Sequence, residues 1–166
     1  MPAWVTIYCA DSVSDVRPEV LLKAISSSDY WTLAEDHGVS EDRVDPAIAE
    51  LCISPLGDGF QLHYQPEGER QLAIRRWNDP ARVAEEAREV LEQIEGDATA
   101  AATQIREHMR GLKAVVAVEL GFTQLEDMGV VFAYEVARWF AQTRRGLIKG
   151  DNENWLRTDD WSFVDL

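Results

Sequence analysis

Few side chains in this chain have the type and spacing that catalysis or metal binding requires. His37 directly follows Glu35 and Asp36, so this run offers two carboxylates and an imidazole. Three consecutive residues do not share one face of a helix or strand, and we interpret them as solvated charges rather than a metal site. Glu135 and Arg138 stand one helical turn apart. They could be a catalytic acid and its tuning cation, but we favour an ion pair within a helix.

The chain lacks the short motifs that mark nucleotide, zinc or acyl-transfer sites. It contains no G-x-G-x-x-G, G-x-x-x-x-G-K-[ST], H-E-x-x-H, G-x-S-x-G or C-x-x-C. Cys9 and Cys52 have no His or Lys nearby in the sequence that would lower the pKa of a thiol, so neither is predicted to be a nucleophile. Whether they lie close enough to form a disulfide is left open. We predict no catalytic residue and no cofactor.

One candidate ligand site lies on two predicted strands. Residues 60–65 alternate between apolar and polar types, as a half-buried strand does, and a second strand follows at 70–77. The outward faces of these strands would carry a histidine, an arginine and a tryptophan beside a tyrosine. The predicted set is His63, Tyr64, Arg75 and Trp77. A small molecule could bind such a set, although a solvated face of an antiparallel sheet is the commoner reason for one.

The charge of the chain restricts its partners. Sixteen Lys and Arg stand against 30 Asp and Glu, for a net charge of −14. This balance opposes binding to nucleic acid or to an anionic membrane and favours a basic partner, or simply solubility. No secretory signal is evident, and the longest apolar run, 128–141, is too short to span a bilayer. We therefore expect a cytoplasmic protein.

The acidic residues are concentrated in two segments. Between Asp29 and Glu50 there are seven acids and one basic residue, and we predict a long loop here with a short helical piece near Pro46–Glu50. Aromatic residues within an acidic rim are typical of a protein-binding surface. The predicted contact residues are Tyr30, Trp31, Glu35, Asp36, Glu41 and Asp42, followed by Trp155 and Trp161 of the acidic tail at 151–166.

These segments must be positioned by a core, and its centre is predicted at Thr123–Arg145. Thr123 and Glu126 have the spacing of a capping box. Polar residues then recur in steps of three and four, as one narrow stripe on an otherwise apolar helix. The stripe consists of Gln124, Asp127, Glu135, Arg138, Gln142 and Arg145. A helix wetted along one thin line is mostly buried against a sheet or other helices.

The remaining pattern predicts an α+β fold in one domain of 166 residues. We expect a single mixed sheet of about five to six strands, with helices packed on one face around the central buried helix. Strands are predicted at 3–10, 51–54, 60–65, 70–77, 113–119 and 146–149, with turns at 55–59 and 66–69. Helices are predicted to start at Pro18, at Pro80 after an Asp79 cap, and near Asp97.

Within that fold we expect a three-strand antiparallel meander at 51–77 and a C-terminal βαβ-like unit. The apolar run at 113–119 is typical of a central strand covered on both faces. If the short strand at 146–149 lies parallel to it, the helix between them completes a right-handed crossover.

The C-terminal third resembles a known kind of protein. Ala-Tyr-Glu-Val-Ala-Arg-Trp-Phe-Ala at 133–141 is followed by Gly146-Leu147-Ile148, then by Asp151 and Trp155. This order is similar to the closing segment of small bacterial α/β immunity proteins, which neutralise secreted polymorphic toxins. The resemblance implies a non-enzymatic inhibitor that binds one cognate toxin, and the acidic charge would suit a basic toxin.

Two other classes remain open at this stage. A ligand-binding protein or enzyme would need a concave site of ~300 Å³ or more with converging polar groups. A homodimeric structural domain would need an isologous contact of well over ~1,000 Å². An inhibitor predicts instead an acidic patch with exposed aromatic residues and no deep polar pocket.

Overall fold

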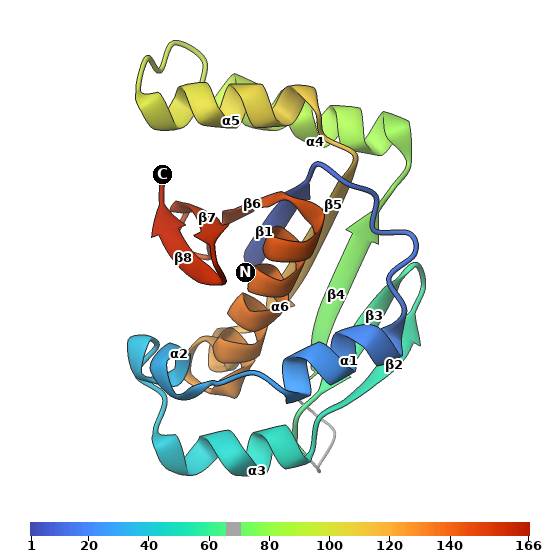
Figure 1. Ribbon diagram of the computed structural model, residues 1–166, viewed down its shortest axis with the longest axis vertical. Coiled ribbons are helices and arrows are strands. Elements are labelled where there is room, and N and C mark those ends of the chain that lie inside the picture. Colours follow the sequence, from blue (N-terminus) through green and yellow to red (C-terminus); the bar gives the residue numbers. More distant parts are fainter. Residues whose placement is uncertain (66–70) are drawn as a thin grey trace.

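A computed structural model of the chain describes residues 1–65 and 71–166 and contains one sheet with helices on both faces (Figure 1). The strands are β1 (Ala3–Cys9), β2 (Cys52–Leu56), β3 (Gly59–His63), β4 (Gln71–Trp77), β5 (Ala114–Leu120), β6 (Gly146–Lys149), β7 (Trp155–Asp159) and β8 (Ser162–Asp165). The α-helices are α1 (Pro18–Ser26), α2 (Trp31–Asp36), α3 (Val44–Ala49), α4 (Pro80–Gln93), α5 (Ala100–Arg110) and α6 (Met128–Arg144), with 3₁₀ turns η1 (Glu41–Arg43) and η2 (Phe122–Glu126). The turn predicted at Pro66–Glu69 lies outside the described residues.

The sheet has eight strands in the order β2-β3-β4-β5-β1-β6-β7-β8, and every neighbouring pair is antiparallel. The predicted meander is present as β2-β3-β4. The prediction of a mixed sheet with five to six strands is wrong. β1 lies between β5 and β6 and pairs with both in antiparallel register, so β5 and β6 run in the same direction without pairing. The β5-α6-β6 unit is therefore a crossover with a strand inserted in its middle.

The two strands that were not predicted come from the acidic tail. Trp155–Asp159 and Ser162–Asp165 form a hairpin that extends the sheet beyond β6. Its two-residue turn contains Asp160 and Trp161, whose φ angles are 47° and 67°. Positive φ at both turn positions is the geometry of a type I′ turn, which matches the twist of the flanking strands. The two strands were not predicted because the segment is rich in aspartate, which is uncommon in strands.

Helix α6 is the centre of the larger core, as predicted, but the first half of the predicted polar stripe is buried. The helix packs against β1, β5, β6 and β7, while α1 and α2 pack on it from the side away from the sheet. Every residue from Met128 to Ala137 is buried. Asp127 and Glu135 are each only 3% exposed. The prediction of an exposed stripe is therefore wrong for Gln124, Asp127 and Glu135, which are buried against Gln71, Tyr64 and Ser28, whereas Arg145 at its end is exposed.

Helices α4 and α5 pack on the opposite face of the sheet, so the prediction that all helices lie on one face is wrong. They cross one end of the sheet (Figure 1) and form a second core with sheet residues. Tyr8, Val115 and Leu147 point into this second core, whereas their neighbours in the strands point toward α6. This alternation is what a strand covered on both faces requires. Elsewhere on this face Trp4 and Ala73 are only half-buried, and Arg75 is exposed.

Side-chain caps determine where the helices begin. Asp79 accepts a hydrogen bond from the Arg82 N–H at 2.9 Å, which confirms the predicted cap of α4. Helix α6 begins at Met128 rather than Thr123, because Asp127 is extended and its carboxylate accepts a hydrogen bond from the Gly129 N–H at 2.7 Å. Thr99, not Asp97, caps α5.

The acidic segment at 29–50 is largely helical, so the prediction of a long loop is wrong, whereas the short helical piece predicted near Pro46–Glu50 is confirmed by α3. It forms α2, η1 and α3, and a row of buried apolar side chains fastens these turns to the core. The row consists of Tyr30, Leu33, Ala34, Val39, Val44 and Ala47. The seven acids are all exposed on the outer side of these turns. Charge therefore lies on one face and apolar contact on the other, which is an amphipathic arrangement in short pieces.

The two cysteines are not partners. Cys9 of β1 is buried, and desolvation raises the pKa of its thiol to about 12. Cys52 of β2 is exposed, and three strands separate it from β1 in the sheet. In the described part of the chain, no helix has the length and apolar character needed to cross a membrane.

Candidate functional site

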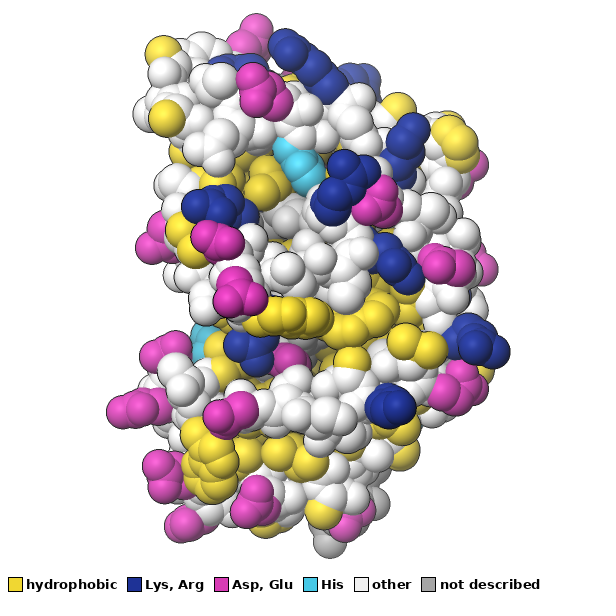
Figure 2. Space-filling view, viewed as in Figure 1, with side chains coloured by type: hydrophobic (Ala, Val, Ile, Leu, Met, Phe, Trp, Pro, Cys, Tyr) yellow, Lys and Arg dark blue, Asp and Glu magenta, His cyan; other side chains and the backbone are white. Residues whose placement is uncertain are grey.

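A pocket of about 670 Å³ lies over α6, between α2 and the β7–β8 hairpin. Its walls combine acidic, hydroxyl and aromatic side chains from four parts of the chain. They are Ala24, Ser28, Asp29, Thr32, Leu33, Asp36, Glu135, Arg138, Trp139, Trp161, Ser162 and Phe163. Figure 2 shows the surface hollowed in this region, with acidic side chains gathered around α2 and α3. Concave sites with a few polar groups among apolar walls are where ligands and partner side chains bind.

Two short elements place the rim of the pocket. Thr32 and Asp36 are four residues apart on α2, so they share the face of the helix that looks into the pocket. Leu33 of the same helix is buried and fixes its rotation. On the other side, the tight hairpin turn holds Trp161 at the mouth of the pocket, where 46% of the residue is exposed.

The floor of the pocket contains a buried ion pair. The Arg138 guanidinium donates a hydrogen bond to the Glu135 carboxylate, and the side chains are 19% and 4% exposed. The Ser28 hydroxyl donates a second hydrogen bond to Glu135. The Arg138 guanidinium also lies 5.7 Å from the centre of the Phe163 ring. The predicted intrahelical pair is confirmed, but it is buried rather than part of a solvated stripe.

The net charge available to a partner comes from the rim rather than the floor. Glu135 and Arg138 neutralise each other, whereas Asp29 and Asp36 are exposed and have no cation among their described partners. Glu35, Glu41 and Asp42 add further exposed carboxylates along the same segment. The pocket therefore opens through an acidic mouth.

Of the predicted contact residues, Asp36 and Trp161 line this pocket, whereas Asp42 lines a second pocket of about 590 Å³ beside α3. Trp31 is 45% exposed and occupies the face of α2 beside the pocket-lining face. Asp36 and Trp161, which come from distant parts of the chain, line the same pocket. Fold formation thus brings the acidic segment and part of the tail together, which the sequence alone did not indicate.

Tyr30 and Trp155 do not belong to this surface. Tyr30 is 1% exposed, its hydroxyl donates to the Ile25 carbonyl at 2.7 Å, and its ring packs edge-on against Phe132. Desolvation raises the pKa of this phenol, so it stays neutral. Trp155 packs against Tyr8 at a ring distance of 5.4 Å in the second core, on the other face of the sheet from the pocket.

His37 directly follows the pocket residue Asp36 and packs against Tyr134 of α6. The His37 and Tyr134 rings are 4.7 Å apart, and the Tyr134 hydroxyl donates to the Asp151 carboxylate at 2.6 Å. Desolvation lowers the pKa of His37, and the opposing effects of Asp151 and Asp36 are smaller. His37 is consequently neutral near pH 7 in the folded protein.

This pKa shift predicts a contribution of His37 to the pH dependence of stability. Because the folded protein holds His37 below its unfolded pKa of about 6.5, protonation favours unfolding. The contribution is present above about pH 6.5 and is lost as the pH falls below it. Urea unfolding at pH 7.5 and pH 5.5 should show a smaller loss of stability for His37→Gln than for the wild type. An equal loss in both proteins would contradict the prediction.

The alternative ligand residues are not gathered around one pocket. His63, Arg75 and Trp77 share a sheet face as predicted, but His63 approaches Ser54 at 3.2 Å while Arg75 pairs with Glu119 at 3.3 Å. Trp77 packs in the second core. Tyr64 points to the opposite face, where its hydroxyl donates to Asp127 at 3.0 Å. Of the four, only Arg75 and Trp77 line a common hollow, of about 270 Å³.

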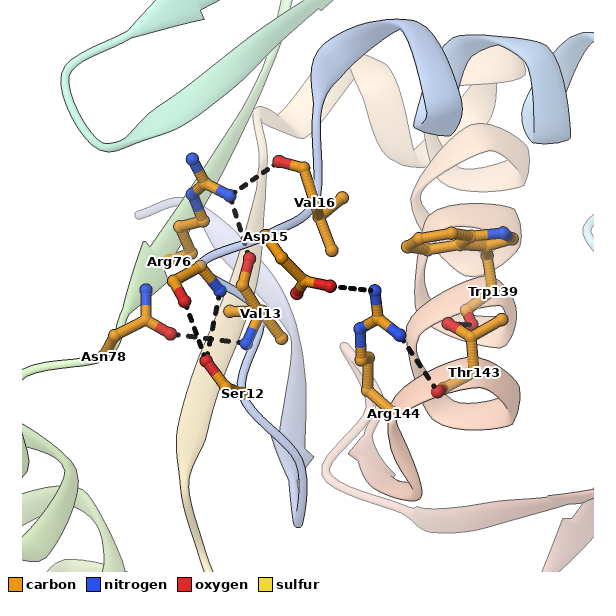
Figure 3. A network of polar contacts seen from close by, with 10 residues as sticks. Ser12, Val13, Asp15, Val16, Arg76, Asn78, Trp139, Thr143 and Arg144 are labelled. Carbon is orange, nitrogen blue, oxygen red and sulfur yellow. Dashed lines mark hydrogen bonds and ion pairs between the residues drawn. The ribbon is translucent and has the colours of Figure 1, made fainter.

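A network of polar contacts fixes the segment that leads into the pocket (Figure 3). The Arg76 guanidinium donates to the carbonyls of Val13 and Val16, both at 2.9 Å. Arg144, near the end of α6, pairs with Asp15 at 3.3 Å. These contacts tie the connection between β1 and α1 to β4 and α6. They set the position of α1, whose C-terminal end is followed by Ser28 and Asp29 at the pocket.

Within residues 1–65 and 71–166 no group of three His, Cys, Asp or Glu side chains is arranged to hold a metal ion. The residues that sequence reasoning missed are Ser28, Asp29 and Phe163. Only the alternation of polar and apolar residues along the tail could have indicated Phe163.

Comparison of the chain with protein-family models, with curated proteins and with solved structures found no match.

Proposed function

We propose that this chain is a non-enzymatic binding protein that holds a basic protein partner through the acidic mouth of the pocket, as an immunity-type inhibitor would hold a toxin. The observation that carries the proposal is the meeting of Asp29 and Asp36 with the exposed Trp161 at one concave site. An aromatic anchor beside exposed carboxylates suits the arginine or lysine side chains of a partner. The net charge of −14 would draw such a partner in.

The buried pair on the pocket floor supports binding rather than catalysis. A general acid or base needs to exchange a proton with a bound substrate. Glu135 is instead held by Arg138 and by the Ser28 hydroxyl. These contacts occupy its carboxylate oxygens and give it a structural role.

The proposal predicts slower association when the acidic face is neutralised. The triple variant Asp36→Asn, Glu41→Gln, Asp42→Asn should reduce the association rate of the basic partner about tenfold at low salt, because steering by these exposed charges is lost. The partner is first identified by pull-down from the native organism with mass spectrometry, and rates are then measured by stopped flow at several salt concentrations.

A charge-matched control keeps this test specific. The variant Glu85→Gln, Glu89→Gln, Glu92→Gln changes the net charge equally, but its positions are exposed on α4, which packs on the other face of the sheet. It should slow association much less. An association rate that is independent of salt and unchanged in the first triple variant would contradict the proposal.

A second candidate function is the binding of a small organic cation in the same pocket. The volume of about 670 Å³ favours it, because small-molecule sites of ~300–1,000 Å³ are typical. Titration of the protein with arginine or spermidine, followed by calorimetry and by Trp fluorescence, separates the two candidates. Saturable binding that Trp161→Gly abolishes would favour the small ligand, whereas no heat would favour the protein partner.

A further inference from the structure

We propose that the free edge of β8 receives an extended cationic segment of the partner as an additional strand, with one of its Arg or Lys side chains in the acidic pocket. This inference rests on the proposed function and specifies how the partner is held. Adding a strand to a sheet edge is a recurrent mode of peptide recognition, in which backbone hydrogen bonds supply affinity and pockets for alternate side chains supply specificity.

The edge of β8 is open in the part of the chain that the structure describes. β8 pairs with β7 on one side, and the strand order ends there. No described backbone hydrogen bond joins Ser162–Asp165 to an element other than β7. An edge strand in this situation presents unpaired N–H and C=O groups to a second chain.

The opposite edge of the sheet is protected in ways that β8 is not. β2 contains Pro55, which lacks an N–H, and α1 packs against this strand. Proline and covering helices are the devices by which proteins prevent pairing at an edge. The sheet thus has one protected edge, at β2, and one open edge, at β8.

The open edge borders the pocket. Trp161, Ser162 and Phe163, at the beginning of β8, form one wall of the pocket, and Asp29 and Asp36 lie on the opposite wall. A segment paired along β8 would therefore run past the mouth of the pocket. Because side chains alternate along a strand, every second side chain of that segment would face the α6 side of the sheet.

The acidic residues around β8 favour a cationic segment at this edge. Asp159 and Asp160 precede β8, Asp165 is its last residue, and all three are exposed. The far wall of the pocket is also acidic. Two copies of the chain paired through β8 would bring these carboxylates together, which disfavours a dimer. A cationic segment would neutralise them instead.

The hairpin turn holds Trp161 at the pocket mouth. Its φ of 67° is in the left-handed region, and a type I′ turn favours Gly at this position. A bulky aromatic residue is strained there, and strained residues cluster at ligand sites. The ring is nonetheless kept at the pocket mouth, half exposed, where it can stack on a guanidinium.

The test uses a synthetic peptide of about seven residues in which Arg alternates with Val and Thr. Its companion has the same sequence with N-methyl groups on two alternate backbone amides, which removes hydrogen-bond donors but no charge. Affinities are measured by calorimetry and by Trp fluorescence. We expect the methylated peptide to bind about tenfold or more weakly, because two backbone hydrogen bonds are lost.

Two further measurements locate the site. On peptide binding, the amide NMR signals of Ser162–Asp165 should shift and become protected from exchange, while those of Cys52–Leu56 on the β2 edge should not. Trp161→Gly should weaken binding at least tenfold yet remain folded, because Gly accepts positive φ without strain.

The outcomes separate this inference from the proposed function. Equal affinity for both peptides would overturn strand addition while leaving a charge-driven partner site intact. Failure of the wild type to bind either peptide would also overturn the inference. The proposed function would fail separately, through a salt-independent association rate of the protein partner.

Discussion

Replacing Glu135 with leucine is expected to lower the free energy of unfolding by about 3 kcal/mol, because it leaves the Arg138 guanidinium without its anion in a largely buried place. The Ser28 hydroxyl would lose its acceptor on the same carboxylate. Breaking one side of a buried pair costs more than the pair itself contributes, since a desolvated charge remains. Arg138 retains some exposure, which places the effect at the lower end of the range for such pairs.

The double variant Glu135→Leu, Arg138→Met is the matched control. It removes both charges and keeps the volume apolar, so its stability should lie within about 1 kcal/mol of the wild type. Urea unfolding followed by Trp fluorescence measures both variants. If the single variant unfolds at the wild-type urea midpoint, the pair is not desolvated in solution. The double variant should also keep fast partner association, because Asp29 and Asp36 remain.

The positions of β1 to β6 followed from local sequence patterns, but their order in the sheet did not. The patterns at 60–65 and 113–119 depend on which faces of a strand are buried, and that burial was predicted correctly. Which strand pairs with which is a tertiary choice. The insertion of β1 between β5 and β6 joins residues from the two ends of the chain, and no local signal encodes it.

The acidic rim of the site was predicted, but the pocket was not. Asp36 and Trp161 were recognised because charge and aromatic type are visible in sequence. Their meeting depends on α2 and the β7–β8 hairpin packing on α6 from opposite sides. Tyr30 was misjudged because it shares the acidic neighbourhood of Trp31 while its ring turns into the core.

The polar stripe predicted along 124–145 shows why periodicity alone does not establish exposure. Each buried polar member has a specific partner that replaces water. The Gln124 amide donates to the Gln71 carbonyl at 3.0 Å, and Asp127 accepts from the Tyr64 hydroxyl at 3.0 Å. Only tertiary structure could distinguish such satisfied groups from a solvated face.

The two glycines of the β2–β3 turn illustrate a related ambiguity. The sequence assigned both Gly57 and Gly59 to a hairpin turn. Gly57 has a φ of 55° and open space around it, so the turn conformation accounts for it. Gly59 has no positive φ and belongs to β3. A Cβ on Gly59 would lie 2.0 Å from the backbone oxygen of Ile74, so this glycine is required for the close approach of β3 to β4.

Gly59→Ala is therefore expected to destabilise the protein by about 3 kcal/mol, because a methyl group cannot fit without moving the neighbouring strand. Gly111→Ala is the matched control, since its nearest non-bonded atom would be 3.9 Å away and its effect should stay within about 1 kcal/mol. Thermal unfolding of the two variants checks both values. A Gly59→Ala protein as stable as Gly111→Ala would mean that β3 and β4 can separate freely. In that case the pairing of β3 with β4 would not be what holds Arg76 against the connection between β1 and α1. It would then not position Ser28 and Asp29, which follow α1 and line the pocket.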